Sequence, residues 1–148
     1  MKRSILLSML VSILLSGCAR DESLDPPAIR FGQDVCAECG MIVSDERFAG
    51  AIQLIDPHGE RQTLLFDDIG EMLKYQLPSH QRMKAWVRDA DTKAWLDAQT
   101  AWFNVKSEQQ TPMATGVSAH ASESAAAASA QAHGGTIVEG DTVARRSR

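Results

Sequence analysis

Short apolar runs separated by turn-forming residues recur along the chain between residues 48 and 139. Runs of about four to eight residues predict strands, and apolar positions three and four residues apart predict an amphipathic helix. The first part of this region predicts strand, strand, helix and strand, at residues 48–56, 61–66, 69–77 and 83–89. Asp67 and Asp68 can cap the start of the helix and Pro78 can end it, although the two carboxylates are also a candidate catalytic pair.

The second part of the region repeats this order. It predicts strands at residues 93–97, 101–105 and 117–121, a helix at 124–133 and a last strand at 136–139. The helix is rich in alanine and serine, so a low-complexity linker is the alternative. Helix is favoured because alanine has the highest helix propensity, Ser122 can cap the start, and Gly134 can end it. Two copies of strand–strand–helix–strand predict an α+β fold.

The N-terminus has the pattern of a bacterial lipoprotein signal. A basic head at Lys2 and Arg3 precedes an apolar run over residues 4–16, which at about 13 residues is short for a membrane span. The run ends in the sequence LSGC, which resembles a lipobox and makes Cys18 the candidate lipidated residue. A plain secretory signal, with Cys18 incidental, is the alternative.

These patterns divide the chain into four segments. We expect a signal peptide at residues 1–17, a polar tether at 18–28, one compact domain at 29–140, and a flexible tail at 141–148. Within the domain, the two ββαβ halves are expected at about residues 29–90 and 91–140. The mature chain has few large aliphatic residues, so its apolar core is expected to be thin.

Composition excludes several classes of function. The 148 residues carry a net charge of −4, which argues against a nucleic-acid-binding protein. Three cysteines cannot form a multi-disulfide scaffold. The sequence has no Ser/His/Asp spacing, phosphate-binding glycine loop or H-E-x-x-H motif, so we do not expect an enzyme.

The candidate chemistry is concentrated in sulfur-bearing residues. Cys36, Cys39 and Met41 lie within six residues, Gly40 allows a tight turn between the last two, and Met113 follows in a second loop. Thiolate and thioether ligands together favour Cu(I). A disulfide is equally compatible with the cysteine pair. Spacing alone also allows a thioredoxin-like redox pair, or a zinc site completed by His58 and His80.

A set of segments in this order resembles the NosL family, the copper-binding lipoproteins that serve the maturation of nitrous oxide reductase. They are LSGC at residues 15–18, CAECGMIV at 36–43, RFA at 47–49, FDDIG at 66–70, WVRD at 86–89, WLDA at 95–98 and TPM at 111–113. The resemblance covers roughly residues 36–140. It implies two ββαβ halves and a Cu(I) site formed by Cys39, Met41 and Met113, with Cys36 as a further candidate ligand.

The resemblance also implies a role. A lipid-anchored periplasmic protein of this family would deliver Cu(I) to the nitrous oxide reductase assembly machinery, an ABC-type transporter complex, or to the reductase itself. Ala19 after Cys18 favours outer-membrane sorting. Two different functions remain open. One is a thiol–disulfide oxidoreductase that uses Cys36 and Cys39, and the other is an interaction module in which these two cysteines form only a structural disulfide.

Overall fold

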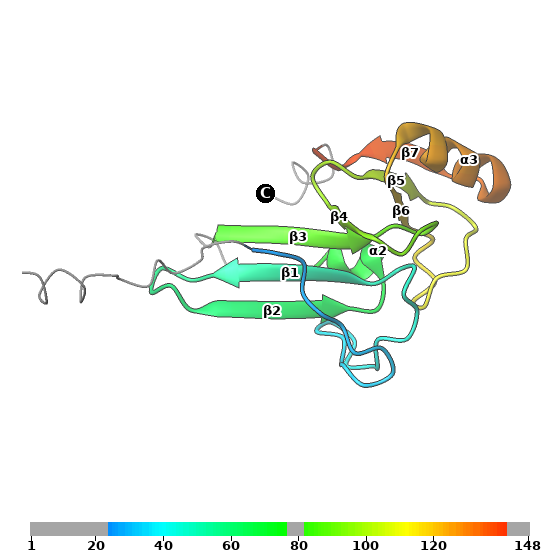
Figure 1. The fold of residues 1–148 in the computed structure, drawn as a ribbon. Helices are drawn as coiled ribbons and strands as arrows, with labels where there is room; N and C mark the ends of the chain where they lie inside the picture. The colour runs from blue at the N-terminus through cyan, green and yellow to red at the C-terminus, as the bar shows by residue number, and fades with distance from the viewer. Residues whose placement is uncertain (1–23, 77–81, 142–148) are drawn as a thin grey trace, which may run out of the picture.

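The computed structural model describes residues 24–76 and 82–141 (Figure 1). The elements in chain order are β1 (Gly50–Ile55), β2 (Arg61–Phe66), α2 (Ile69–Met72), β3 (Arg82–Arg88), β4 (Trp95–Asp97), β5 (Trp102–Val105), β6 (Ser118–His120), α3 (Glu123–His133) and β7 (Thr136–Glu139). The signal peptide with Cys18, Pro78, and all but the first residue of the expected tail lie outside the described residues. No helix of the described part is long and apolar enough to cross a membrane.

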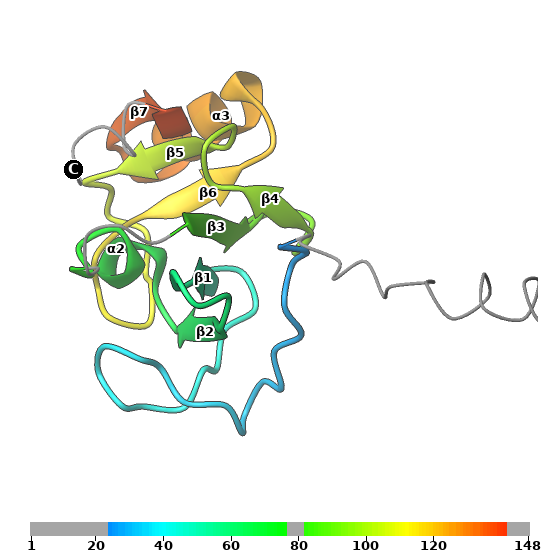
Figure 2. The same ribbon diagram turned by 90° about the vertical axis from the view of Figure 1, so that its left-hand side faces the viewer.

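Two antiparallel sheets carry the predicted repeat. The first has the strand order β2-β1-β3-β4, and the second has the order β6-β5-β7. In each half the first strand is therefore central, the second strand pairs on one side, and the strand after the helix pairs on the other. Figure 2 shows the two sheets as neighbouring layers, with α3 on the outside of the second. The α+β fold of two ββαβ units is confirmed.

One predicted strand belongs to the other half. β4 pairs with β3, with Val87 opposite Leu96, and has no partner among the described strands of the second sheet. The first sheet thus extends beyond residue 90, where we expected the first half to end. An apolar strand alone does not show which of two edges it will join.

The helix predicted over residues 69–77 is shorter than expected. α2 has four residues, and the chain continues from it in i→i+3 turns, in which Lys74 N donates to Glu71 O and Tyr75 N donates to Met72 O. The Tyr75 ring packs edge-on against Phe66, with centroids 5.1 Å apart. The apolar residues after Met72 therefore contact the core from a turn. Because the i→i+3 turns repeat nearly as a helix does, the spacing of these residues resembled that of a longer helix.

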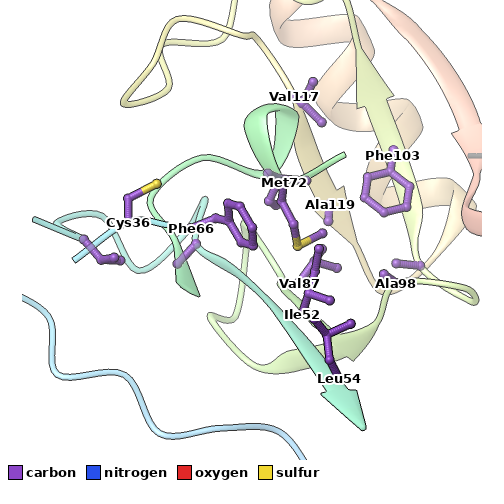
Figure 3. Close-up of a cluster of buried hydrophobic side chains, with 14 residues drawn as sticks. Cys36, Ile52, Leu54, Phe66, Met72, Val87, Ala98, Phe103, Val117 and Ala119 are labelled. Carbon is purple, nitrogen blue, oxygen red and sulfur yellow. The ribbon is translucent and has the colours of Figure 1, made fainter. Parts of the chain in front are cut away.

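A single core runs through both halves. Its fully buried side chains include Phe66 and Val87 from the first half and Phe103 from the second (Figure 3). The Ala/Ser-rich segment is helical, as predicted, with Ser122 Oγ accepting from Ala125 N. This helix adds only Ala126 to the buried residues, so its contribution to the core is small.

Candidate metal centre

The sulfur-bearing segment forms a tight loop against the first sheet. Cys36 N donates to Met41 O at 2.7 Å, and Gly40 N donates to Cys36 O at 3.0 Å. Gly40 has φ +73°, a left-handed conformation that favours glycine. Ala37 N donates to Leu65 O, which attaches the loop to β2. The loop therefore returns on itself between the first cysteine and Met41, and the expected tight turn at Gly40 is present.

The two cysteines meet inside this loop. Both thiols are free, so the structure does not contain the disulfide that was one interpretation of the pair. Cys36 is buried and Cys39 is partly buried. Their sulfur atoms and one carboxylate oxygen of Glu71 lie within 4.8 Å of one another, and the Cys36 thiol donates to Glu71 Oε2 at 3.8 Å. Three groups that can bind a metal ion thus converge at one point.

The pKa of the Cys39 thiol lies above its ordinary value. It is raised from 9.0 to about 11, mainly by desolvation, with smaller contributions from the neighbouring Cys36 and Glu71, while a hydrogen bond from the Met41 backbone lowers it. At neutral pH the thiol is protonated. A metal ion that binds this sulfur must displace the proton.

Met41 lies on the exposed side of the same loop. Its side chain is 47% exposed, and with Ser44 and Asp67 it lines a hollow of about 440 Å³. Residues 110–112, from the loop that precedes β6, line the same hollow. Met113 comes next in this loop, although its side chain is not among the described residues that line the hollow. The two methionine-bearing loops, 72 residues apart in sequence, therefore face one hollow.

Asp67 attaches the first of these loops. Its carboxylate accepts from Ser44 N at 2.7 Å and from the Ser44 hydroxyl. Because Asp67 follows directly after β2, the sheet holds the loop of Met41 from both sides, through Leu65 and through this carboxylate.

Asp68 attaches the second loop. It is fully buried and caps α2, accepting from Gly70 N at 2.7 Å. The same carboxylate accepts from the hydroxyls of Thr111 and Thr115 and from Met113 N at 3.1 Å. The helix-cap interpretation of Asp68 is confirmed, and it is incomplete, because this side chain also holds the loop of Met113 against the first half.

Gly70 makes this attachment sterically possible. A Cβ atom at this position would lie 2.3 Å from the Thr115 hydroxyl oxygen. Thr115 can therefore reach Asp68 only across a residue without a side chain. The FDDIG segment is a structural device that joins the two halves at the site.

Some predicted site residues are not brought together. His58 lies in the turn between β1 and β2, at the end of the sheet away from Phe66, so the zinc site completed by His58 is wrong. Its other partner, His80, lies outside the described residues.

The structure adds Glu71 to the site, and sequence analysis did not identify this residue. One sequence feature could have identified Glu71. It lies in the first turn of a helix capped by Asp68, and side chains of a first turn point back toward the segment that precedes the helix.

The donor set fits a soft metal ion. Two thiols and an adjacent thioether lie on one short loop, and a second thioether follows on the loop opposite. Soft donors of this kind select Cu(I) over harder cations. Among the described residues, one carboxylate, that of Glu71, lies with the two thiols.

Comparison with known proteins gives concordant matches. The NosL family model matches residues 29–147. The copper-binding lipoprotein NosL of Stutzerimonas stutzeri is 30% identical in an alignment that covers 90% of this chain and 75% of that protein. The crystal structure of the copper chaperone NosL from Shewanella denitrificans superposes with a TM-score of 0.63 at 19% identity, covering 78% of this chain and 92% of that one. The last match concerns the fold alone.

Proposed function

This chain belongs to the NosL family, and on that premise we propose that it is a copper chaperone of the cell envelope. It binds Cu(I) as cargo and passes it to the machinery that assembles nitrous oxide reductase. The observation that carries this proposal is the pair of free thiols beside Met41, on a loop that faces the loop of Met113 across one hollow.

The ligands we propose are Cys39, Met41 and Met113, with Cys36 as a further donor. Cys39 is more accessible than the buried Cys36, so it can exchange a metal ion with a partner. Met41 is half exposed, which supports the same role. Ligands on loops at the surface suit transfer, because an incoming donor can replace them one at a time.

Partner docking is supported by the surface around the site. Val35 and Ile42 flank the cysteine loop, pair with each other in an isolated bridge, and are both more than half exposed. Large apolar side chains left in water beside a site are typical of a surface that contacts another protein. We propose that the receiving partner, an ABC-type transporter complex or the reductase itself, covers these residues during transfer.

We further propose that the chain is anchored by a lipid on Cys18 in the periplasm, at the outer membrane. The relative from Stutzerimonas stutzeri is named a lipoprotein, and in this chain the lipobox-like sequence LSGC ends at Cys18, the residue type that carries the lipid in bacterial lipoproteins. An anchor limits diffusion to the membrane surface, where a membrane-bound partner would be met.

The raised pKa of Cys39 weighs against the oxidoreductase alternative. A catalytic C-x-x-C pair needs a thiolate nucleophile, which enzymes obtain by lowering the pKa at a helix N-terminus or beside a cation. Here Cys36 is buried, and the pKa of Cys39, the more accessible thiol, is raised to about 11, mainly by burial.

The proposal is tested in cells of the source organism that lack the chain. They should make nitrous oxide reductase with reduced copper content, and the wild-type chain should restore it. Cys39→Ser should fail to restore it, whereas Met83→Leu, a change to an exposed residue on β3, should restore it fully. Normal copper content in the reductase without this chain would refute the delivery role.

A further inference from the structure

Three side chains that copper binding does not use converge where the two halves meet. Asp89 and Asp91 follow directly after β3, and His120 is the last residue of β6. The backbone joins the two segments here, because Ala90 N donates to Ala119 O at 2.9 Å. One oxygen of each aspartate and one ring nitrogen of His120 lie within 4.8 Å of one another. None of the three lines the hollow described above or belongs to the cysteine cluster.

His120 is held as a metal-binding histidine is held. Its side chain is almost fully buried, with Nε2 3.0 Å from Ser118 Oγ and Nδ1 3.0 Å from Asp91 Oδ2. Histidine ligands donate from one ring nitrogen to a fixed oxygen while the other nitrogen binds the ion. With the proton on Nε2, Ser118 supplies that oxygen. Without an ion, Nδ1 donates to the carboxylate of Asp91, so a metal ion that binds Nδ1 displaces that proton.

The two carboxylates differ in a way that suits binding. Asp89 is buried, and its oxygens are fixed by Asp91 N at 3.1 Å and by the Thr92 hydroxyl at 2.8 Å. Each carboxylate oxygen keeps a second lone pair for another partner. The side chain of Asp91 is 60% exposed, so it opens the cluster to solvent. One rigid and one accessible carboxylate give a fixed ligand and an entry path.

The charge at this point is not balanced by a fixed cation. Lys93 lies in the same turn, but its ammonium group pairs with Glu46 at 3.3 Å. Within residues 24–76 and 82–141, no Lys or Arg forms an ion pair with Asp89 or Asp91. Two carboxylates beside one imidazole therefore offer a negative site to a cation.

We propose that Asp89, Asp91 and His120 form a second metal site, which binds a divalent ion of the zinc class. One nitrogen and two oxygens are borderline-to-hard donors, so this site discriminates against Cu(I), which prefers sulfur. Three protein ligands leave a coordination position for water, as in open zinc sites. Because the aspartates belong to the first half and His120 to the second, the ion ties the two halves together and stabilises the folded chain.

The test is a Zn(II) titration of the ¹⁵N-labelled full chain in detergent, followed through the histidine ring nitrogens by NMR. The His120 signals are identified by their absence in His120→Gln. We expect Zn(II) to shift His120 Nδ1 to the range of a metal-bound nitrogen, with the ring proton on Nε2 in the bound state. Ring signals of His120 that do not move while Zn(II) binds elsewhere would overturn the proposal.

Three variants locate the effect. Asp91→Asn keeps the size of an exposed residue and should raise the Zn(II) concentration for half-saturation at His120 at least about tenfold. Glu60→Gln removes an exposed carboxylate at the far end of the first sheet and should respond as the wild type. Cys39→Ser should also leave the His120 response unchanged, so the result is independent of copper binding. Equal half-saturation in Asp91→Asn and Glu60→Gln would contradict the assignment.

Discussion

At the scale of single residues, the site depends on side chains whose neighbours decide their chemistry. The C-x-x-C spacing indicated a metal or redox role for Cys36 and Cys39, but spacing does not show burial. Burial raises the pKa of the Cys39 thiol to about 11, further above neutral pH than its ordinary value. Glu71 was not predicted as a site residue, because it reaches the cysteines only after α2 has folded onto the loop, 35 residues away in sequence from Cys36.

The pKa of Cys39 predicts slow alkylation. Its folded value, about 11, lies above the ordinary 9.0, so the neutral thiol is favoured by folding. At pH 8 the folded chain should therefore react with iodoacetamide at Cys39 roughly tenfold to a hundredfold more slowly than the chain in urea. The associated stability is fully present below pH 9 and is lost as the pH rises through 11. Residue-resolved mass spectrometry measures the rates, and equal rates in both states would contradict the prediction.

Asp68 is the residue whose loss should cost the most stability at the site. Asp68→Ala removes the acceptor of four donors, on Gly70, Thr111, Met113 and Thr115, in a buried position. We expect a loss of about 3 kcal/mol or more in the free energy of unfolding, measured with urea.

Ser122→Ala is the matched control for Asp68. Ser122 caps α3 through a single backbone donor, Ala125 N, at an exposed position, so its loss should cost about 1 kcal/mol. A similar cost for the two variants would mean that Asp68 acts as a helix cap and does not hold the loop of Met113.

At the scale of elements, local patterns predicted type and order better than extent and pairing. β2 and β7 match the predicted ranges, since turn residues mark both of their ends. α2 is shorter than predicted because Tyr75 packs on Phe66 from a turn. β4 joins the first sheet because one edge of β3 is free to pair with it. The sequence does not show which strand edges are free, since this depends on how the other strands have paired.

α3 shows how small residues can replace a large apolar face. Ala126 is fully buried, and the Asn104 amide donates to Ser129 Oγ at 3.2 Å and to Gly134 O at 3.0 Å. The helix thus contacts the second sheet through an alanine and hydrogen bonds. A larger side chain at this contact would not fit without displacement of the helix.

This contact predicts different effects on stability for two similar substitutions. Ala126→Leu adds atoms to a closed contact and should lower the free energy of unfolding by about 1–3 kcal/mol. Ala128→Leu, on the exposed face of the same helix, should change it by less than about 0.5 kcal/mol. Thermal and urea unfolding measure both. If Ala126→Leu is as stable as Ala128→Leu, the helix does not pack on the sheet as described.

At the scale of the whole molecule, hydrogen bonds at two places in the described part of the chain join the two halves, in addition to their shared core. The loop of Met113 is bonded to Asp68 of the first half, and the turn after β3 is bonded to β6 through Ala119. The repeat and the resemblance predicted two halves with sulfur ligands from both. Neither predicted that Asp68 and Asp91 would connect the two halves, because their partners, Met113 and His120, are distant in sequence.

Membrane anchoring is predicted by the N-terminal pattern. Cys18→Ser should release the protein from membranes into the soluble fraction of the cell envelope, because the lipid would no longer be attached. Fractionation after cell disruption measures this. A wild-type protein that is already soluble in this assay would show that Cys18 carries no lipid.

The central claim is that sulfur ligands from both halves hold one Cu(I) ion. An anaerobic Cu(I) competition titration of the reduced full chain tests it on wild type, Met113→Leu and Met83→Leu. Both substitutions preserve side-chain volume, and Met83 is an exposed methionine on β3 that the proposal does not use. We predict one Cu(I) per chain, an affinity at least about tenfold weaker in Met113→Leu, and no change in Met83→Leu. Equal affinities in all three proteins would contradict the account.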